Sequence, residues 1–346
     1  MAYYKKLKQY KYDRENGRDP DVDFIPQKET WIAKRLIDLR QTIRASDLGN
    51  RGHENLVIGS WNIRAFDEGA PRRDESYHYI AEIIDHFDIC AVQEVKQDLE
   101  PLKRLVRLLG PNWSYFVTDV TEGSLGNKER QAFIFNTDRV QFRNVVGEIT
   151  LGKDELIDGD QIARTPFFAS FQAGWFRFTL VSVHIIFGED KAKRRAEIAA
   201  LSKRINERAE TDGEVYVLIG DMNIEKREDD IFKGLSDHGL TVPFFGPTNL
   251  GGTKYYDQIA FTGDRVKTHL VRSGAIDWRG DVYGDADKAT YLPMVQAARE
   301  AAGKDMYANW DTAYQNYFAS FEMSDHLPIW VEIKTDYSDE YLKRFL

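Results

Sequence analysis

Hydrophobic and polar positions follow two kinds of period along this chain. Short apolar runs that end in a polar residue or a glycine predict buried strands, and apolar residues three or four positions apart predict amphipathic helices. The apolar runs predict strands over residues 56–63, 88–95, 131–136, 167–172, 176–186, 215–220, 255–261 and 327–333. The helical spacing predicts helices over residues 29–46, 74–87, 98–110 and 190–210.

The mixture of strands and helices predicts α/β layers, with buried strands in the middle and amphipathic helices outside. Residues 1–54 precede the first strand and form an N-terminal extension with one amphipathic helix. Residues 55–335 form the layered domain, in which residues 274–323 read as a helical and loop insertion before the final strand. Residues 336–346 form a C-terminal tail.

Charge, cysteine content and the lengths of apolar runs exclude some classes of protein. The net charge of −9 argues against a protein that coats nucleic acid through bulk charge, although it allows a local basic patch. Cys90 is the only cysteine, so an intramolecular disulfide and a cysteine-based zinc site are excluded. The first residues lack an apolar leader, and no run approaches the length of a membrane span. We therefore expect a cytoplasmic protein that does not contact a membrane.

Acids, amides and histidines recur where the predicted strands end or begin. Any one of them would be an ordinary polar strand end, and "GDMN" alone could be a local turn held by its Asp and Asn. Each such group costs roughly 1 to 3 kcal/mol when it is buried without a partner, so we expect the set to pair internally or with a metal. Active sites of layered α/β proteins gather where strand ends converge. The set comprises Asn62, Glu94, His184, Asp221, Asn223, Asp257, Asp325 and His326.

The residue types in this set point to a particular chemistry. Carboxylate and amide oxygens suit a hard cation such as Mg²⁺ or Mn²⁺. Two histidines can remove a proton from water and give one to a leaving group. The phosphate-binding pattern GxxxxGK[ST] and a serine nucleophile elbow are both absent. A metal with a base and an acid is the equipment for phosphate-ester hydrolysis.

Six blocks in chain order, "GSWNIRAF", "CAVQEV", "LVSVHI", "LIGDMN", "YYDQIAF" and "SDHLPIW", resemble the endonuclease/exonuclease/phosphatase superfamily. The resemblance covers about residues 56 to 335 and is greatest to the deoxyribonuclease I branch, here as an intracellular member of bacterial type. It implies a four-layer α/β (α+β) sandwich: two packed, mostly antiparallel β-sheets flanked by helices. The active site is then expected where the strand ends of the two sheets meet.

The resemblance also assigns roles at the metal and the phosphate. Glu94 matches the principal ligand of Mg²⁺ or Mn²⁺, helped by Asn62 and Asp325, and Ca²⁺ could serve as a structural ion. Asp221 and Asn223 match the pair that holds the scissile phosphate and the attacking water.

The acid and base roles follow from the same resemblance. His184 and His326 match the two acid/base histidines, and Asp257 fits the residue that orients His326. Glu129 matches a carboxylate that hydrogen-bonds the first histidine. The alternative for Glu129 is a solvated loop acid.

Four arginines are candidates for contact with substrate phosphates. Arg64 matches a residue that contacts the nucleic-acid backbone in the family, and Arg130 is a weaker candidate for the same role. Arg72 and Arg73 stand in the loop after "WNIRAF", where a solvated loop is the alternative. Gln258 replaces the Arg that follows the catalytic Asp in the deoxyribonucleases, which puts one substrate contact in doubt.

These features predict a divalent-metal-dependent phosphodiester hydrolase, a DNA endonuclease of low sequence specificity. One alternative is a phosphomonoesterase or phosphodiesterase that acts on a small or lipid-headgroup phosphate. Another is a non-catalytic binding module that keeps the fold. We expect a nucleic acid as the substrate, DNA before RNA, and allow for a protein partner at residues 1–54 or 274–323.

Overall fold

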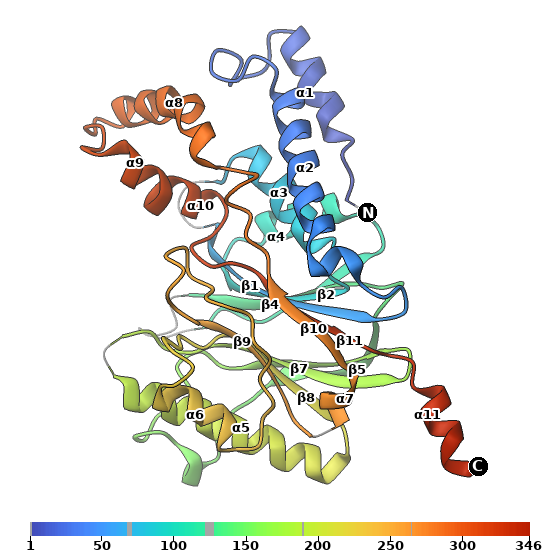
Figure 1. Cartoon of the computed structure of the whole chain (residues 1–346). Coiled ribbons are helices and arrows are strands. Elements are labelled where there is room, and N and C mark those ends of the chain that lie inside the picture. Colours follow the sequence, from blue (N-terminus) through green and yellow to red (C-terminus); the bar gives the residue numbers. More distant parts are fainter. Residues whose placement is uncertain (1, 68–70, 122–127, 189, 264) are drawn as a thin grey trace.

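The computed structural model describes residues 2–67, 71–121, 128–188, 190–263 and 265–346. Two β-sheets lie against each other, and helices cover both outer faces (Figure 1). Helices α1 to α4 and α8 to α10 lie on the side of one sheet, and α5 and α6 lie on the side of the other (Figure 1). The predicted four-layer sandwich is confirmed.

The strands are β1 (Leu56–Phe66), β2 (Ile89–Val95), β3 (Trp113–Val117), β4 (Arg130–Asn136), β5 (Gln141–Glu148), β6 (Phe167–Ala173), β7 (Phe176–His184), β8 (Val215–Asp221), β9 (Asp257–Phe261), β10 (Leu270–Ala275) and β11 (Ile329–Ile333). The helices are α1 (Lys6–Glu15), α2 (Lys28–Ala45), α3 (Asp74–Ile84), α4 (Glu100–Leu109), α5 (Lys191–Asp212), α6 (Asp230–Ser236), α7 (Arg265–His269), α8 (Lys288–Ala301), α9 (Trp310–Ala313), α10 (Ser320–Glu322) and α11 (Ser338–Leu342). A π-helical turn, Tyr314–Ala319, joins α9 to α10.

Each sheet contains a parallel pair among antiparallel strands. The first sheet has the order β10-β11-β1-β2-β4-β3, with β1 and β2 parallel. The second has the order β5-β6-β7-β8-β9, with β7 and β8 parallel. Two neighbouring parallel strands have their carboxyl ends on the same side of a sheet, so each sheet brings two strand ends together.

The core between the sheets is built from the inward faces of their strands. It includes Ile58, Ala91, Phe171, Leu180 and Ile219, all fully buried. Separate apolar clusters hold α2, α3 and α4 to the outer face of the first sheet and α5 to the outer face of the second. Because the central strands are buried on both faces, their sequences are continuous apolar runs.

The sequence pattern missed three strands, β3, β5 and β10, and each lies at the edge of a sheet. β5 shows the reason, since most of its residues are exposed or half-buried and no apolar run marks it. Edge strands are held mainly by backbone pairing to one neighbour, which leaves little trace in the pattern of side chains.

The N-terminal extension contains two helices where the sequence predicted one. α1 has no apolar stripe, and Tyr10 is its only buried residue, so its periodicity is weak. α2 buries Ile32, Leu36, Leu39 and Ile43 in the same cluster as α3. The division of the chain at residues 54 and 335 stays a prediction. No helix in the described part of the chain is both long and apolar enough to cross a membrane.

A buried carboxyl group attaches the 274–323 segment to α3. The carboxylate of Glu322, 5% exposed, accepts hydrogen bonds from the backbone N–H of Arg73 at 2.9 Å and from the hydroxyl of Ser76 at 2.5 Å. Burial raises the pKa of Glu322 to about 7, although the Ser76 hydroxyl opposes the shift. A folded-state pKa above the unfolded value means that the native state binds the proton more tightly, so stability falls as pH rises between the two values.

We expect Glu322→Gln to weaken this pH dependence. The wild type should lose about 2 to 3 kcal/mol of unfolding free energy at this group as pH rises through 7, because the buried carboxylate must ionise. The variant cannot ionise and should lose less between pH 5 and pH 8 in urea titrations. Glu300→Gln, at an exposed position of α8, is the matched control and should follow the wild type. A Glu322→Gln variant with the wild-type pH profile would contradict this account.

Candidate active site

Strand register aligns three of the predicted residues in one row of the second sheet. His184, at the end of β7, pairs with Asp221 at the end of β8. Asp221 pairs in turn with Asp257, the first residue of β9. The three side chains therefore start from directly paired positions on three neighbouring strands, at one end of these strands.

The end of β8 is a tight turn that requires its particular residues. Gly220 has a φ of +133°, and a Cβ there would lie 2.1 Å from the carbonyl oxygen of Val183, so the position requires glycine. Oδ1 of Asp221 accepts a hydrogen bond from the backbone N–H of Asn223 at 2.9 Å. Asn223 has a φ of +52°, which Asn tolerates better than most residues. The local turn that "GDMN" suggested is thus present at the same place as the candidate site.

The first sheet meets this row through Asn62 and Glu94. The Nδ2 atom of Asn62 donates to Oε1 of Glu94 at 3.0 Å and to Oδ2 of Asp221 at 3.0 Å, so it links the two sheets. Oε2 of Glu94 accepts from the backbone N–H of Ala65 at 2.8 Å. Glu94 has a φ of +59°, a left-handed conformation that costs about 1 to 2 kcal/mol for a residue with a side chain. Strained residues of this kind cluster at functional sites.

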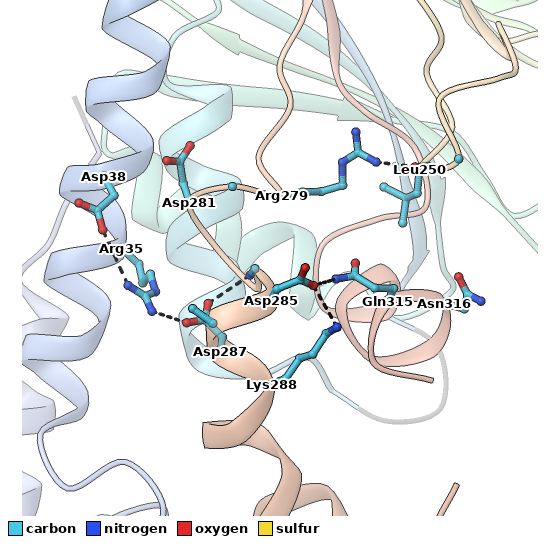
Figure 2. A pocket seen from close by; sticks show the side chains of 14 residues that line it. Arg35, Asp38, Leu250, Arg279, Asp281, Asp285, Asp287, Lys288, Gln315 and Asn316 are labelled. Atoms are coloured by element: carbon cyan, nitrogen blue, oxygen red, sulfur yellow. Dashed lines mark hydrogen bonds and ion pairs between the residues drawn. The ribbon is translucent and has the colours of Figure 1, made fainter. Parts of the chain in front are cut away.

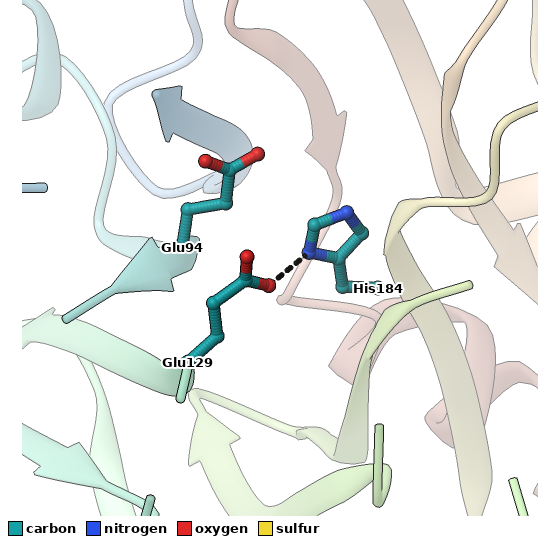
Figure 3. Close-up of side chains that lie close together, drawn as sticks. All are labelled: Glu94, Glu129 and His184. Atoms are coloured by element: carbon teal, nitrogen blue, oxygen red, sulfur yellow. Dashed lines mark ion pairs between the residues drawn. The ribbon is translucent and has the colours of Figure 1, made fainter. Parts of the chain in front are cut away.

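The donor atoms around Glu94 fit a hard divalent cation. Oδ1 of Asn62 is buried and has no hydrogen-bond partner, so an amide oxygen there is left to coordinate a cation. Carboxylate and amide oxygens are the ligands that Mg²⁺ and Mn²⁺ prefer. Glu94, Glu129 and His184 each offer a ligand atom, and these atoms lie within 4.8 Å of one another (Figure 3).

Asp325 is partly exposed. Its side chain is 47% exposed, and Oδ2 lies 4.0 Å from Nε of Arg64. Among the described residues it belongs to neither of the two clusters of acids and histidines that could hold a metal ion. Its assignment as a metal ligand stays a prediction.

His184 and Glu129 form a close pair. Nδ1 of His184 lies 2.8 Å from Oε2 of Glu129, on the segment just before β4 (Figure 3). Two cations that the sequence reading missed also contact this carboxylate: Nε of Arg164 at 2.9 Å and Nζ of Lys96 at 3.3 Å. Burial alone would raise the pKa of Glu129, but the hydrogen bond and charge of His184, with Arg164 and Lys96, lower it to about 2. Glu129 is a buried, paired carboxylate rather than a solvated loop acid.

One of the missed cations could have been found from its position. Lys96 follows Glu94 by two residues, at the same strand end. Arg164 stands in an irregular segment before β6, where no pattern marks it.

His326 and Asp257 form the second pair. Nδ1 of His326 lies 2.8 Å from Oδ2 of Asp257, which is fully buried. Burial alone would lower the pKa of His326, but the carboxylates of Asp257 and Asp221 raise it well above its ordinary value. A carboxylate on Nδ1 fixes the tautomer and leaves Nε2 for chemistry.

The two histidine pairs converge on Asp221. Nε2 of His184 lies 3.5 Å from Oδ2 of Asp221, and Nε2 of His326 lies 3.7 Å from the same oxygen. The Nε2 atoms of both histidines therefore lie close to the same oxygen of Asp221. Two proton-transferring groups on one region suit the removal of one proton and the delivery of another.

The four arginines separate into two groups. Arg64 keeps a side chain that is 34% exposed and donates to the hydroxyl of Ser320 at 2.5 Å. Arg130 donates to the carbonyl oxygen of Thr118 at 2.6 Å and has a side chain that is 16% exposed. Both stay candidates for phosphate contact.

Arg72 and Arg73 require a correction. Arg72 is 2% exposed, ion-paired with Asp67, and donates to the carbonyl oxygen of Arg64. Arg73 is held by Glu75 at 2.6 Å and by Asp21 of the N-terminal extension at 2.7 Å. Because carboxylates of the protein hold both guanidinium groups, we no longer assign either residue to the substrate.

Gln258 stands where the family has an Arg. It is 1% exposed, and its Nε2 donates to the carbonyl oxygen of Tyr255 at 2.8 Å. The side-chain amide is held by the backbone, and the doubt about one substrate contact at this position remains.

A cleft of about 800 Å³, lined mainly by polar residues, lies between α2 and the 274–323 segment (Figure 2). It is lined by α2, by the loop around residues 279–288, and by Gln315 and Asn316, whose carbonyl oxygen accepts from Arg64 at 3.2 Å. Its cations are already paired, Arg35 with Asp287 and Lys288 with Asp285 (Figure 2). The predicted insertion therefore shapes the surface beside the site without adding free positive charge at this cleft.

The fold and the site define a class. A model of the endonuclease/exonuclease/phosphatase family matches residues 59–269, more than half of the chain, so the chain belongs to this family. Among individual proteins, it is 28% identical to deoxyribonuclease-1 of Equus caballus over 183 residues, 49% of this chain and 61% of that protein. It is 30% identical to deoxyribonuclease-1 of Gallus gallus over 156 residues, 42% of this chain and 52% of that protein. The chain thus matches between about half and three fifths of the length of these relatives.

Solved structures share the fold at low identity. The mannosyl-6-phosphatase Bt3783 of Bacteroides thetaiotaomicron aligns with a TM-score of 0.53 and 17% identity, over 80% of this chain and 99% of that one. The TDP2 of D. rerio, solved with a single-strand DNA product, aligns with a TM-score of 0.51 and 12% identity, over 80% of this chain and 98% of that one. At these identities the likeness shows the fold alone.

Proposed function

We propose that this protein is a divalent-metal-dependent phosphodiesterase, a DNA endonuclease of low sequence specificity. The observation that carries the proposal is the convergence of two histidines, each held by its own carboxylate, on one oxygen of Asp221. Similarity to two deoxyribonucleases favours DNA among the phosphate esters that such a site could hydrolyse.

Each side chain has a defined part in the proposed reaction. A carboxylate oxygen of Glu129 and one of Asp257 each lie 2.8 Å from Nδ1 of their histidines, and this negative charge raises the basicity of Nε2. One histidine then accepts a proton from the attacking water at Nε2, and the other gives a proton from Nε2 to the departing oxygen. Asp221 and Asn223 orient the water and the phosphate, and the hydrogen bond between them keeps Asp221 in place.

Glu94 and Asn62, with Asp325, are the residues that we propose to hold the cation. Mg²⁺ or Mn²⁺ bound there would neutralise the charge that develops on the phosphate oxygens. The unpaired Oδ1 of Asn62 and the carboxylate of Glu94 would supply oxygen ligands for it.

The location and further partners are also proposals. A lone, buried Cys90 is compatible with a reducing compartment, and we propose that the protein works in the cytoplasm. A protein partner at residues 1–54 or 274–323 stays a prediction.

A substrate panel tests the proposed function. Supercoiled plasmid, a random-sequence duplex, a soluble inositol phosphate and a small phosphodiester should each be incubated with Mg²⁺ and with chelator. We expect nicking of the plasmid and cuts at many positions of the duplex, because phosphate contacts carry no sequence information. Release of phosphate from the inositol compound alone would favour a phosphomonoesterase, and a single cut at one recognition sequence would contradict low specificity.

A further inference from the structure

An apolar ring stands exposed beside the candidate active site. Phe187 follows His184 by three residues, and its side chain is 70% exposed. Among the described residues only one phenylalanine, Phe345 near the C-terminus, is more exposed. Phe187 instead lies on the segment between β7 and α5, which leaves the row of strand ends that carries the catalytic groups.

Phe187 continues a chain of rings that starts at His326. The ring of Tyr256 lies 5.6 Å from the imidazole of His326, tilted by 37°. Phe187 meets Tyr256 edge to face, with 6.4 Å between ring centroids and an angle of 87°. The rings therefore extend from an acid/base group outward to solvent.

A buried arginine anchors the segment that carries Phe187. Arg194 of α5 is 1% exposed and donates to the carbonyl oxygens of Ile186 at 3.1 Å and of Gly188. The same guanidinium donates to the carbonyl oxygen of Asn223 at 2.9 Å and lies 5.8 Å from the Phe187 ring centroid. The exposed ring is thus fixed to the turn that carries the phosphate-orienting pair.

Of the four arginines that the sequence predicted as phosphate contacts, only Arg64 and Arg130 stay candidates. The net charge of the chain is −9, and Arg72 and Arg73 are committed to internal carboxylates. Stacking of a nucleobase on an aromatic side chain supplies about 1 to 3 kcal/mol per base and tolerates any base. A base inside a duplex is already stacked on its neighbours, so only an unpaired base can use such a ring without extra cost.

We propose that Phe187, packed edge to face against Tyr256, is a stacking platform for the nucleobase beside the scissile phosphate, which makes unpaired strands the preferred substrate. This inference rests on the proposed function, since it assumes that the phosphate at His184 and His326 belongs to a nucleic acid. It identifies Phe187 as a specificity-determining residue, and Arg194 as the positioning residue that holds it.

Binding in chelator tests the platform independently of cleavage. A dye-labelled single strand of ten thymidines and a strand of equal length without bases are titrated into the protein, and fluorescence anisotropy gives each Kd. We expect the wild type to bind the base-bearing strand about tenfold more tightly, and Phe187→Ala to abolish this preference while its affinity for the base-free strand stays the same. Phe187→Trp should keep the preference.

Trp175→Ala is the matched control. Trp175 is 45% exposed and precedes β7, while Phe187 lies beyond its other end, about 30 Å away at the usual rise of a strand. We expect this variant to keep the wild-type preference. Equal binding of both strands by the wild type, or an unchanged preference in Phe187→Ala, overturns the platform.

Cleavage of the same strands in Mg²⁺ then separates the two proposals. If the binding preference depends on Phe187 but nothing is cut, the platform stands and the proposed nuclease activity fails. If strands are cut with no dependence on Phe187, the proposed function stands and the platform fails.

Discussion

Replacement of either His184 or His326 by alanine should reduce turnover of DNA by about 10² to 10⁴, the usual contribution of one acid or base group. The reason is geometric, because each Nε2 lies within 3.7 Å of the same oxygen of Asp221 and each Nδ1 is held by a carboxylate. Because the transition state needs both proton transfers, the remaining histidine cannot stabilise it alone. Initial rates at saturating and at low substrate measure the loss.

The double variant makes this prediction sharper. Since both histidines serve one transition state, their losses should not add, and His184→Ala/His326→Ala should be barely worse than the poorer single variant. His53→Ala, at an exposed position in the segment before β1, is the control and should keep full activity. Thermal unfolding of each variant identifies a merely structural role. A single variant with near-wild-type turnover would show that the paired mechanism is wrong.

Removal of the divalent cation, or of the Glu94 carboxylate, should abolish most activity. The candidate site gathers several carboxylates, and without a cation they would repel a phosphate rather than stabilise its developing charge. We expect cleavage to stop in EDTA and to return with Mg²⁺ or Mn²⁺. Glu94→Ala should fold and yet lose most of its turnover at any cation concentration.

A stability measurement checks the cation independently of turnover. A ligand that binds only the native state raises its stability in proportion to the logarithm of ligand concentration over Kd. Addition of Mg²⁺ should therefore raise the thermal midpoint of the wild type and of Glu54→Gln, a variant at an exposed glutamate. It should have little effect on Glu94→Ala. Undiminished cleavage in chelator, or an equal midpoint shift in Glu94→Ala, would remove Glu94 from the metal site.

The exposure of the arginines could not be predicted from the sequence. Arg64 and Arg72 both follow the first predicted strand, and in the sequence both are candidates for phosphate contact, Arg64 by resemblance and Arg72 by its place in the loop. In the fold, Arg64 stays partly exposed, whereas Arg72 is buried against Asp67 and the backbone of Arg64. Whether a loop cation faces solvent depends on how the loop packs, and the residue types around it do not encode that.

Aromatic residues give a second example. Phe187 and Phe171 are both phenylalanines in or next to predicted strands, and the period of apolar residues does not distinguish a buried ring from an exposed one. Phe171 is fully buried between the sheets, while Phe187 is 70% exposed. In the fold, Arg194 in the first turn of α5 donates to the carbonyl oxygens on either side of Phe187, a contact that apolar periodicity does not record.

The sequence by itself determined the layered fold and the chemical set of the candidate site. Central strands that are buried on both faces require long apolar runs. A polar residue at the end of such a run can be recognised in the sequence because it interrupts the run, and its burial costs free energy unless it has a partner. Only the tertiary structure decided the edge strands β3, β5 and β10, the pairing of Glu129 with Arg164 and Lys96, and the burial of Arg72. These features depend on contacts between segments far apart in the chain. Such contacts leave no local period, because the partner that satisfies each group is supplied by the fold.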